Sequence, residues 1–223
     1  MDLRVIELGL ISYADAFDLQ KRLTEERRVG SIRDTLLLLE HPPTITLGRN
    51  ADRSHIVATA EQLRERGLAC VETDRGGDVT YHGPGQLVGY PILDLNAPPH
   101  RPDLHRYFRL LEDSLISALG AFGIAGDRFE GYTGVWIKPD GAPPEKIAAM
   151  GIRVSRWITR HGFALNVCPD LEHFASIVPC GIHDYGVTSM SRVLKKDVSV
   201  ASVIPAVTQA FAETFGLRIA AAE

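Results

Sequence analysis

Two apolar segments near the middle of the chain, KIAAMGIRVS at residues 146–155 and TRHGFALNV at residues 159–167, are separated by only three residues. Each has the length and apolar character of a strand, and the short separation lets the two pair as neighbours. Further strand-like runs lie at residues 5–8, 35–39, 44–47, 87–95 and 134–137. The runs at 35–39 and 87–95 are continuously apolar, which predicts buried strands.

Helix-start and helix-stop residues predict the helical segments that separate these strands. Ser12 and Asp15 form a capping-type start for a helix that Gly30 ends. A regular apolar stripe of leucines and Phe108 predicts the longest helix at residues 102–122. Shorter or later helices are expected at residues 61–66 and 199–215.

The order of these elements indicates the fold class. Strands and helices are interspersed without strict βαβ alternation, so the sequence predicts an α/β (α+β) mixed sheet packed with helices. The 223 residues show no internal repeat, low-complexity tract or linker. We therefore expect one catalytic-type domain covering residues 1–223.

Composition excludes several classes of protein. Hydrophobic residues make up 45% and charged residues 23% of the chain, which is typical of a soluble globular protein. The formal net charge of −4 gives no support to nucleic-acid binding. No apolar run approaches the ~18 residues of a membrane span, and the N-terminus does not resemble a signal peptide. A cytoplasmic protein without membrane or nucleic-acid partners is expected.

The most unusual segment is the glycine-rich RGGDVTYHGPGQ at residues 75–86. Glycine permits positive φ angles and lets a ligand approach the backbone closely. Arg75 and His82 lie within this segment, which favours a ligand-binding loop over a turn-rich connector. The segment matches neither the P-loop nor the GxGxxG pattern, so it does not indicate a nucleotide.

The chain has three cysteines, and they lack the CxxC spacing of a disulfide framework or structural zinc site. Cys70 and Cys168 lie in apolar, strand-like surroundings, which predicts small buried side chains. Cys180 lies between Pro179 and Gly181, in a sharp turn that could present a thiol. A structural and a reactive role for Cys180 are equally compatible with this local pattern.

A lysine and two histidines are further candidates. Lys146 begins an apolar strand, where it is either solvent-exposed or a cation beside a thiol, which would lower the cysteine pKa. His161 enters an apolar strand and is either a core residue or, with His82, part of a pocket wall. A metal site from His82, His161 and Cys180 matches no known spacing, so we expect no metal.

Taken together, these segments resemble the lipoyl(octanoyl) transferase family, octanoyl-[acyl-carrier-protein]:protein N-octanoyltransferases. The resemblance covers nearly the whole chain, from residues 40–43 to residues 186–189. Its most specific blocks are residues 75–86, 146–151, 161–166 and 179–182. The resemblance implies a fold like that of the catalytic domains of biotin and lipoate protein ligases.

The resemblance also implies functional residues. Cys180 would carry the acyl group as a thioester, and Lys146 would activate it, with His82 or His161 as a possible helper. The residues implied to line the acyl-substrate site are Arg75, Gly76, Gly77, Asp78, Val79, Thr80, Tyr81, His82, Ala149, Met150, Gly151, Gly162, Phe163 and Ala164. Among these, Val79, Met150 and Phe163 would hold the acyl chain.

The implied reaction transfers an octanoyl group from octanoyl-acyl carrier protein to a lysine of lipoyl domains, the first step of endogenous protein lipoylation. The acceptors would be lipoyl domains of 2-oxoacid dehydrogenase complexes and the glycine cleavage H protein, and no cofactor is required. Backbone N–H groups near Gly76–Gly77 or Cys180–Gly181 are candidate oxyanion donors. Arg153, Arg156 and Arg160 either form a basic docking patch for these acidic partners or are solvated strand-edge arginines.

Three other functions remain open from the sequence. An ATP-dependent lipoate or biotin-type ligase would use the same fold without a cysteine. A cysteine thioesterase would pass the acyl group to water, and a binding module would perform no chemistry. The Pro-Cys-Gly turn and the lack of a phosphate-binding motif favour the transferase.

Overall fold

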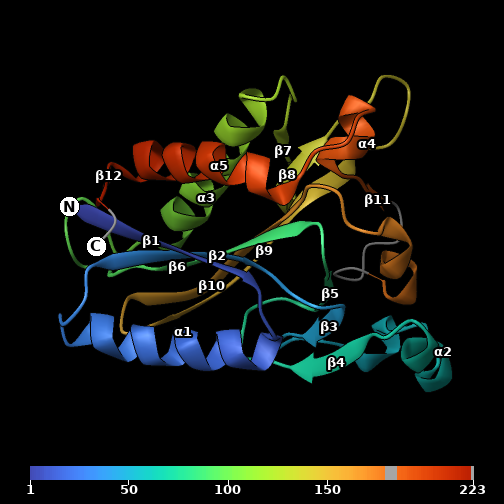
Figure 1. The fold of residues 1–223 in the computed structure, drawn as a ribbon, viewed down its shortest axis with the longest axis horizontal. Helices are drawn as coiled ribbons and strands as arrows, with labels where there is room; N and C mark the ends of the chain where they lie inside the picture. Colours follow the sequence, from blue (N-terminus) through green and yellow to red (C-terminus); the bar gives the residue numbers. More distant parts are fainter. Residues whose placement is uncertain (179–184, 222–223) are drawn as a thin grey trace.

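The computed structural model describes residues 1–178 and 185–221 of the chain. A large mixed sheet, seen almost edge-on in Figure 1, runs through the middle of the molecule. Its strand order is β12-β1-β2-β6-β10-β9-β8-β7, and β11 pairs with the outer part of β9. The bounds of these strands are β1 (Asp2–Leu10), β2 (Asp34–Glu40), β6 (Gln86–Ile92), β7 (Asp127–Phe129), β8 (Tyr132–Ile137), β9 (Glu145–Ser155), β10 (Ile158–Asn166), β11 (Gly186–Val187) and β12 (Arg218–Ile219).

A second, three-stranded sheet lies at one end of the large sheet (Figure 1). It has the order β4-β3-β5, with bounds β3 (Thr44–Leu47), β4 (Ala69–Glu72) and β5 (Val79–His82). The short helices η1 (Arg53–His55), α2 (Ala60–Glu65) and η2 (Leu171–Ser176) accompany it. This small sheet has its own core of apolar side chains, including Ile45, Val79 and Tyr81.

Helices cover both faces of the large sheet. Helices α3 (Leu104–Gly120) and α5 (Val200–Phe215) lie on one face, and α1 (Tyr13–Arg28) lies on the other (Figure 1). The short α4 (Met190–Leu194) precedes α5. Strand β2 shows why its sequence is continuously apolar: Leu36 and Leu38 belong to the α3–α5 core, whereas Leu37 and Leu39 belong to the α1 core.

The predicted pair of central strands is confirmed as the antiparallel hairpin of β9 and β10, in which Ser155 pairs with Ile158. The intervening Arg156 and Trp157 have φ angles of 50° and 65°. Two consecutive residues with positive φ form the type I′ turn, whose twist matches that of the flanking strands. The turn is therefore one residue shorter than the sequence spacing indicated.

The predicted mixed sheet and its helices are confirmed, with shifts at their ends. The longest helix starts at Leu104 because the side chain of Asp103 caps it, accepting from the backbone N of Arg106 at 3.0 Å. The strand predicted at residues 87–95 ends at Ile92. Within the described residues, no helix combines the length and the apolar character needed to cross a membrane.

Asp34, the first residue of β2, connects this strand to helix α1 and to the loop segment at residues 94–100. Its fully buried carboxylate accepts from Arg27 Nε of α1 at 2.7 Å, from His100 Nε2 at 2.6 Å and from the backbone N of Asp94 at 3.1 Å. Burial alone would raise the pKa of Asp34, but the hydrogen bonds from His100 and Arg27 outweigh it and hold this pKa below its usual value.

Replacing Asp34 with alanine should lower the free energy of unfolding by about 3–5 kcal/mol, because it leaves the buried guanidinium of Arg27 without its partner. The lowered pKa means that Asp34 contributes its stability above the unfolded pKa and loses it as pH falls through the folded value. The difference in free energy of unfolding between wild type and Asp34→Ala should therefore become smaller at acidic pH. Urea unfolding at several pH values measures this, and Asp18→Ala in an exposed pair with Lys21 is the control. An unchanged urea midpoint for Asp34→Ala would contradict the prediction.

Candidate active site

A narrow pocket opens where β5 of the small sheet approaches β9 and β10 of the large sheet. Its volume is about 40 Å³, which is room for a few water molecules. The pocket is lined by Arg75, Gly77, Thr80, His82, Ala149, Met150, Gly151, Gly162, Phe163 and Ala164, all of which the sequence analysis had named.

Strand alternation separates the residues of β5 into two groups. Thr80 and His82 line the pocket. Val79 and Tyr81 point to the opposite face, where both are buried in the core of the small sheet. The expectation that Val79 contacts the acyl chain, and that Tyr81 lines its site, is therefore corrected by the two-residue period of the strand.

Gly76 and Asp78 also lie outside the pocket lining. The backbone N of Gly76 donates to the carbonyl oxygen of Ile152 at 2.8 Å, so this N–H is already used and does not fit the oxyanion role expected for it. The carboxylate of Asp78 pairs with His55 Nδ1 at 2.5 Å and accepts from the backbone N of Asp52 at 3.0 Å. Both residues thus fix the loop that carries their neighbours.

Arg75 brings a buried positive charge to the pocket wall. Its side chain donates to the hydroxyl and the carbonyl oxygen of Thr46, with Nη2 at 2.9 and 2.8 Å from these atoms. Only glycine fits at position 48, because a Cβ there would lie 2.3 Å from the carbonyl oxygen of Gly77 and 2.9 Å from Arg75 Nη1. A Cβ at Gly151 would lie 3.1 Å from Arg75 Cδ. The glycines therefore allow the arginine to pack against the backbone.

Three buried histidines lie in and behind this pocket. Burial lowers the pKa of His82 to about 3, with a further contribution from His41, and lowers the pKa of His41 to about 4. Burial also lowers the pKa of His161 to about 4, although Asp74 acts in the opposite direction. All three rings are therefore neutral near pH 7, so they can act as hydrogen-bonding groups but do not carry charge.

His161 does not line the pocket. Its Nε2 lies 2.8 Å from Asp74 Oδ1, its ring stacks on Phe17 at 5.5 Å, and its backbone φ is 56°. The backbone N of His161 donates to Gln20 Oε1 of α1 at 2.8 Å. Of the two histidines considered for a pocket wall, only His82 occupies that position. Within the described residues, no cluster of three or more histidine, cysteine or acidic side chains could hold a metal.

The three arginines considered as a docking patch have different surroundings. Arg160 forms a close ion pair with Asp74, and Arg153 Nε lies 3.4 Å from the same carboxylate. Only 14% of the Arg160 side chain is exposed. Arg156 lies in the exposed hairpin turn. Arg153 and Arg160 are thus bound to Asp74, and they are not freely solvated strand-edge side chains.

Lys146 lies at the start of β9, where a bulge changes its register against β8. Val135 pairs with Ala148 but Trp136 pairs with Lys146, so one residue of β9 is skipped. Such bulges redirect side chains. Lys146 Nζ lies 4.7 Å from the ring centroid of buried Trp136, whose opposite neighbour Tyr185 has its ring centroid 5.7 Å away. Gly134 on β8 allows this close pairing, since its φ is 123° and a Cβ there would lie 2.5 Å from the carbonyl oxygen of Ala148.

The candidate nucleophile Cys180 and its neighbour Gly181 lie outside the described residues. Both flanking segments are held in place. The backbone N of Val178 donates to the carbonyl oxygen of His55 at 2.7 Å, and Val187 pairs with Lys146 in the parallel β11–β9 pair. The chain that follows the candidate cysteine is therefore attached directly to the strand that carries the candidate lysine.

The prediction that Cys70 and Cys168 are buried is wrong, because both are exposed. Cys70 lies on β4, an outer strand of the small sheet, with one face toward solvent. Cys168 follows the end of β10. Partial burial nevertheless raises the pKa of each thiol, so neither is activated as a thiolate.

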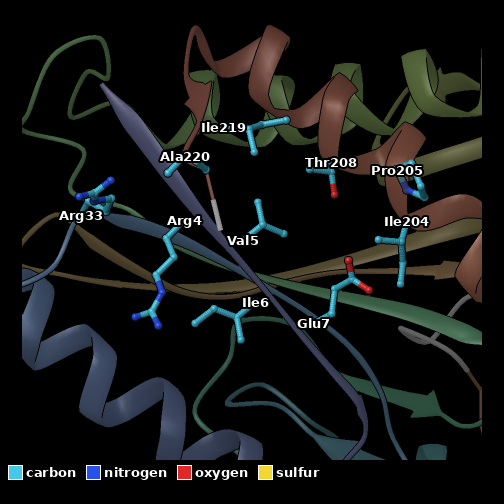
Figure 2. Close-up of a pocket in the computed structure, with 11 residues that line it drawn as sticks. Arg4, Val5, Ile6, Glu7, Arg33, Ile204, Pro205, Thr208, Ile219 and Ala220 are labelled. Carbon is cyan, nitrogen blue, oxygen red and sulfur yellow. The ribbon is translucent and has the colours of Figure 1, made fainter. Parts of the chain in front are cut away.

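A larger cavity of about 630 Å³ lies on the other side of the molecule, between β1 and α5 (Figure 2). Its walls include Arg4, Glu7, Ile204 and Thr208. None of the residues that the sequence analysis named as site residues lines it. The smaller pocket is the candidate active site because it combines a buried arginine, a neutral histidine and apolar walls.

Sequence reasoning missed several side chains around the site. Trp136 contacts Lys146, Thr46 binds Arg75, and His41 packs edge-on against His82 with ring centroids 5.7 Å apart. His41 lies in the Glu-His-Pro-Pro segment that had already supported the family resemblance, so a signal existed for this residue. Trp136 and Thr46 lie within predicted strands, and no feature of the neighbouring sequence distinguished them from structural residues.

Comparison with known proteins agrees with this fold. Residues 12–212 match the family described as the lipoyl protein ligase A/B catalytic domain. The chain is 50% identical over 213 residues to an octanoyltransferase of Koribacter versatilis, covering 96% of this chain and 84% of that protein. It is also 50% identical over 217 residues to an octanoyltransferase of Chloroflexus aggregans, covering 97% and 96% of the two chains.

Solved structures with the same fold are much more distant in sequence. A lipoate protein ligase of Thermoplasma acidophilum has a TM-score of 0.74 at 17% identity, covering 100% of this chain and 87% of that one. A biotin protein ligase of Aquifex aeolicus has a TM-score of 0.53 at 16% identity, covering 97% and 70% of the two chains. The expected fold, that of lipoate and biotin ligase catalytic domains, is confirmed.

The buried histidines predict a steep loss of stability in mild acid. Their folded pKa values of about 3 to 4 lie below the ordinary histidine pKa of about 6.5, so the unfolded chain binds protons first as pH falls. Stability should be fully present above pH ~6.5 and decrease below it, by up to about 1.4 kcal/mol per pH unit for each ring. Urea unfolding at pH 7, 6 and 5 measures this slope. His161→Asn should make the slope shallower, whereas equal stability at pH 7 and pH 5 in wild type would contradict the assignment.

Proposed function

The chain belongs to the lipoyl protein ligase A/B catalytic-domain family and is an acyltransferase, and we propose that it transfers octanoyl from octanoyl-acyl carrier protein to a lysine of lipoyl domains. The observation that carries this proposal is the pocket between β5, β9 and β10. Ten residues expected to surround an acyl substrate converge there from three separate segments of the chain.

The lining of the pocket suits a thioester with an alkyl chain. Met150, Phe163, Ala149 and Ala164 provide apolar surface, and each methylene buried against such surface contributes about 0.8 kcal/mol. Met150 is unbranched and can rearrange to admit a chain larger than the present cavity. A medium acyl chain should therefore bind much better than acetyl.

The proposed reaction has two half-reactions through Cys180. The cysteine thiolate attacks the carrier thioester, a new carbon–sulfur bond forms, and the phosphopantetheine thiolate leaves and takes up a proton. The acceptor amine then attacks the acyl-cysteine, a carbon–nitrogen bond forms, and the cysteine thiolate leaves. The amine loses one proton in this second step, so a base is needed.

Lys146 is the proposed base, and the first half-reaction gives it a way to become neutral. If it passes its proton to the departing thiol, it can accept one from the attacking amine. His82 was a possible helper in this transfer. Its pKa of about 3 makes it too weak a base to hold a proton near pH 7, so its proposed role is that of a hydrogen-bond acceptor.

Wild-type protein mixed with octanoyl-acyl carrier protein should gain the mass of one octanoyl group, because the thioester intermediate accumulates when no acceptor is present. Cys180→Ala should gain no mass. Addition of a lipoyl domain should discharge the adduct and transfer the same mass to that domain. Intact-protein mass spectrometry measures all three species.

The alternatives give different results in the same experiment. Turnover in wild type without an adduct, together with a requirement for ATP, would support a ligase that uses an adenylate. Release of free octanoate in the presence of abundant lipoyl domain would support a thioesterase. Cys70→Ala is the matched control, since it removes an exposed thiol that lies outside the pocket lining.

Lys146→Arg should retain a cation at this position but lose at least about 10²-fold in transfer rate, because arginine does not act as a base near neutrality. Rates between pH 6 and pH 9, with octanoyl-acyl carrier protein and a lipoyl domain, measure the effect. Full activity of Lys146→Arg across this range would exclude Lys146 as the base. Lys138→Arg, on the exposed loop after β8, is the control.

A further inference from the structure

Four buried polar groups connect the pocket to the strand that carries Lys146. His82 Nδ1 lies 2.8 Å from Gln86 Oε1, and Gln86 Nε2 lies 2.9 Å from Asn166 Oδ1. Asn166 Nδ2 donates to the carbonyl oxygen of Thr188 at 3.0 Å, and the backbone N of Thr188 donates to the carbonyl oxygen of Lys146 at 3.0 Å. His82, Gln86, Asn166 and Thr188 are each at most 6% exposed.

The donors and acceptors in this chain can be arranged in only one way. The carbonyl oxygen of Thr188 accepts hydrogen bonds and cannot donate them, so Asn166 must present its amide nitrogen to it. The amide oxygen of Asn166 then faces Gln86, which must present its own nitrogen. Gln86 therefore turns its oxygen toward His82, and Nδ1 of His82 must carry the proton.

A second contact fixes Gln86 in the same orientation. Its Nε2 also lies 3.3 Å from the backbone carbonyl oxygen of Tyr81. A reversed amide would place its oxygen against two acceptors, the carbonyl of Tyr81 and the side-chain oxygen of Asn166. Burial makes such an arrangement costly because no water can compensate for it. The orientation is thus set by two independent acceptors.

The neutral ring of His82 consequently has a free lone pair on Nε2. His82 lines the pocket, and within the described part of the chain this nitrogen makes no hydrogen bond. A bare ring nitrogen accepts hydrogen bonds, and the protic groups of the proposed reaction are a thiol S–H and an amine N–H. The opposite tautomer would present a proton there and repel either donor.

We propose that Gln86 and Asn166 are positioning residues, which hold His82 as the Nδ1–H tautomer so that Nε2 accepts a hydrogen bond from the protonated departing thiol or from the attacking amine in the pocket. This inference rests on the proposed function and extends it to two residues that lie outside the pocket lining. Because the chain of bonds ends at Lys146, the same residues also join the pocket to the segment that carries the proposed base.

The first test is the tautomer of His82, which does not depend on activity. Nitrogen-15 NMR of histidine-labelled protein distinguishes the two neutral tautomers, and His82 is assigned from a His82→Asn spectrum. Wild type should show Nδ1 protonated and Nε2 bare. Gln86→Met, which has similar size but no acceptor, should shift His82 toward the Nε2–H form. A wild-type Nε2–H ring, or an unchanged ring in Gln86→Met, would overturn the inference.

The second test measures the two half-reactions separately. Octanoyl loading from carrier protein and discharge to a lipoyl domain are followed in single turnovers at pH 8. Gln86→Met should slow at least one of them by about tenfold, the effect of losing one hydrogen bond in the transition state. Unchanged rates in both would overturn the inference. Gln209→Met, on the exposed face of α5, is the control.

A further variant leaves Gln86 in place and weakens only its orientation. Asn166→Ala removes the shorter of the two hydrogen bonds that orient the Gln86 amide and keeps the longer one to Tyr81, so it should populate the Nε2–H tautomer beside the Nδ1–H form. This variant provides the same readout if Gln86→Met does not fold.

The two proposals fail in distinguishable ways. If wild type neither forms an acyl adduct nor transfers octanoyl, the proposed function is wrong, while the tautomer measurement still stands. If wild type transfers octanoyl normally and Gln86→Met matches it in both tautomer and rate, the proposed function stands and the positioning role is wrong.

Discussion

The antiparallel pairing of β9 and β10 is the constraint on which both the fold and the site depend. The hairpin lies inside the large sheet, where Leu165 belongs to the α3–α5 core and Ala164 to the α1 core. Its register places Met150 opposite Phe163 and Gly151 opposite Gly162, and all four line the pocket. A slip of one residue between the two strands would separate the side chains of Met150 and Phe163 onto opposite faces.

Glycine makes this arrangement possible at the points where backbones approach most closely. A Cβ at Gly162 would lie 2.3 Å from the carbonyl oxygen of Gly89, and a Cβ at Gly89 would lie 2.1 Å from the ring of Phe163. The phenyl ring thus lies over bare backbone of β6. This part of the pocket is therefore formed by contact between strands, whereas Arg75 and Gly77 reach it from a loop.

Burial has a stronger effect than neighbouring charges on the pKa values of the three histidines in and behind the pocket. The histidines behind the pocket lose their protons, while Arg75 is held among neutral oxygen atoms of Thr46 and Gly76. Among the described residues, the pocket lining presents the guanidinium of Arg75 and the neutral ring of His82 to a ligand. Such preorganised dipoles need little rearrangement when charge develops on a reacting carbonyl.

The sequence by itself determined the main strands and helices, and it marked the segments in which candidate site residues lie. Strand and helix patterns predicted the mixed sheet, because continuous apolar runs such as residues 35–39 require burial whatever their partners are. The blocks around Arg75, Lys146 and His161 were recognisable, since glycines and charged residues inside apolar strands are unusual. Very short elements such as β11 and β12 carried no signal, because two residues have no detectable period.

Only the tertiary structure decided which members of those blocks face the pocket. Val79 and Tyr81 alternate with Thr80 and His82, and the choice between the two faces depends on which side of β5 the large sheet packs. His161 binds Asp74 behind the pocket because its strand pairs on both sides. The tautomer of His82 depends on Thr188, more than a hundred residues away, whose carbonyl reaches it only through packed side chains. The face to which a side chain points, the partner of a strand and the direction of a hydrogen bond all depend on contacts between distant segments. Local sequence does not encode such contacts.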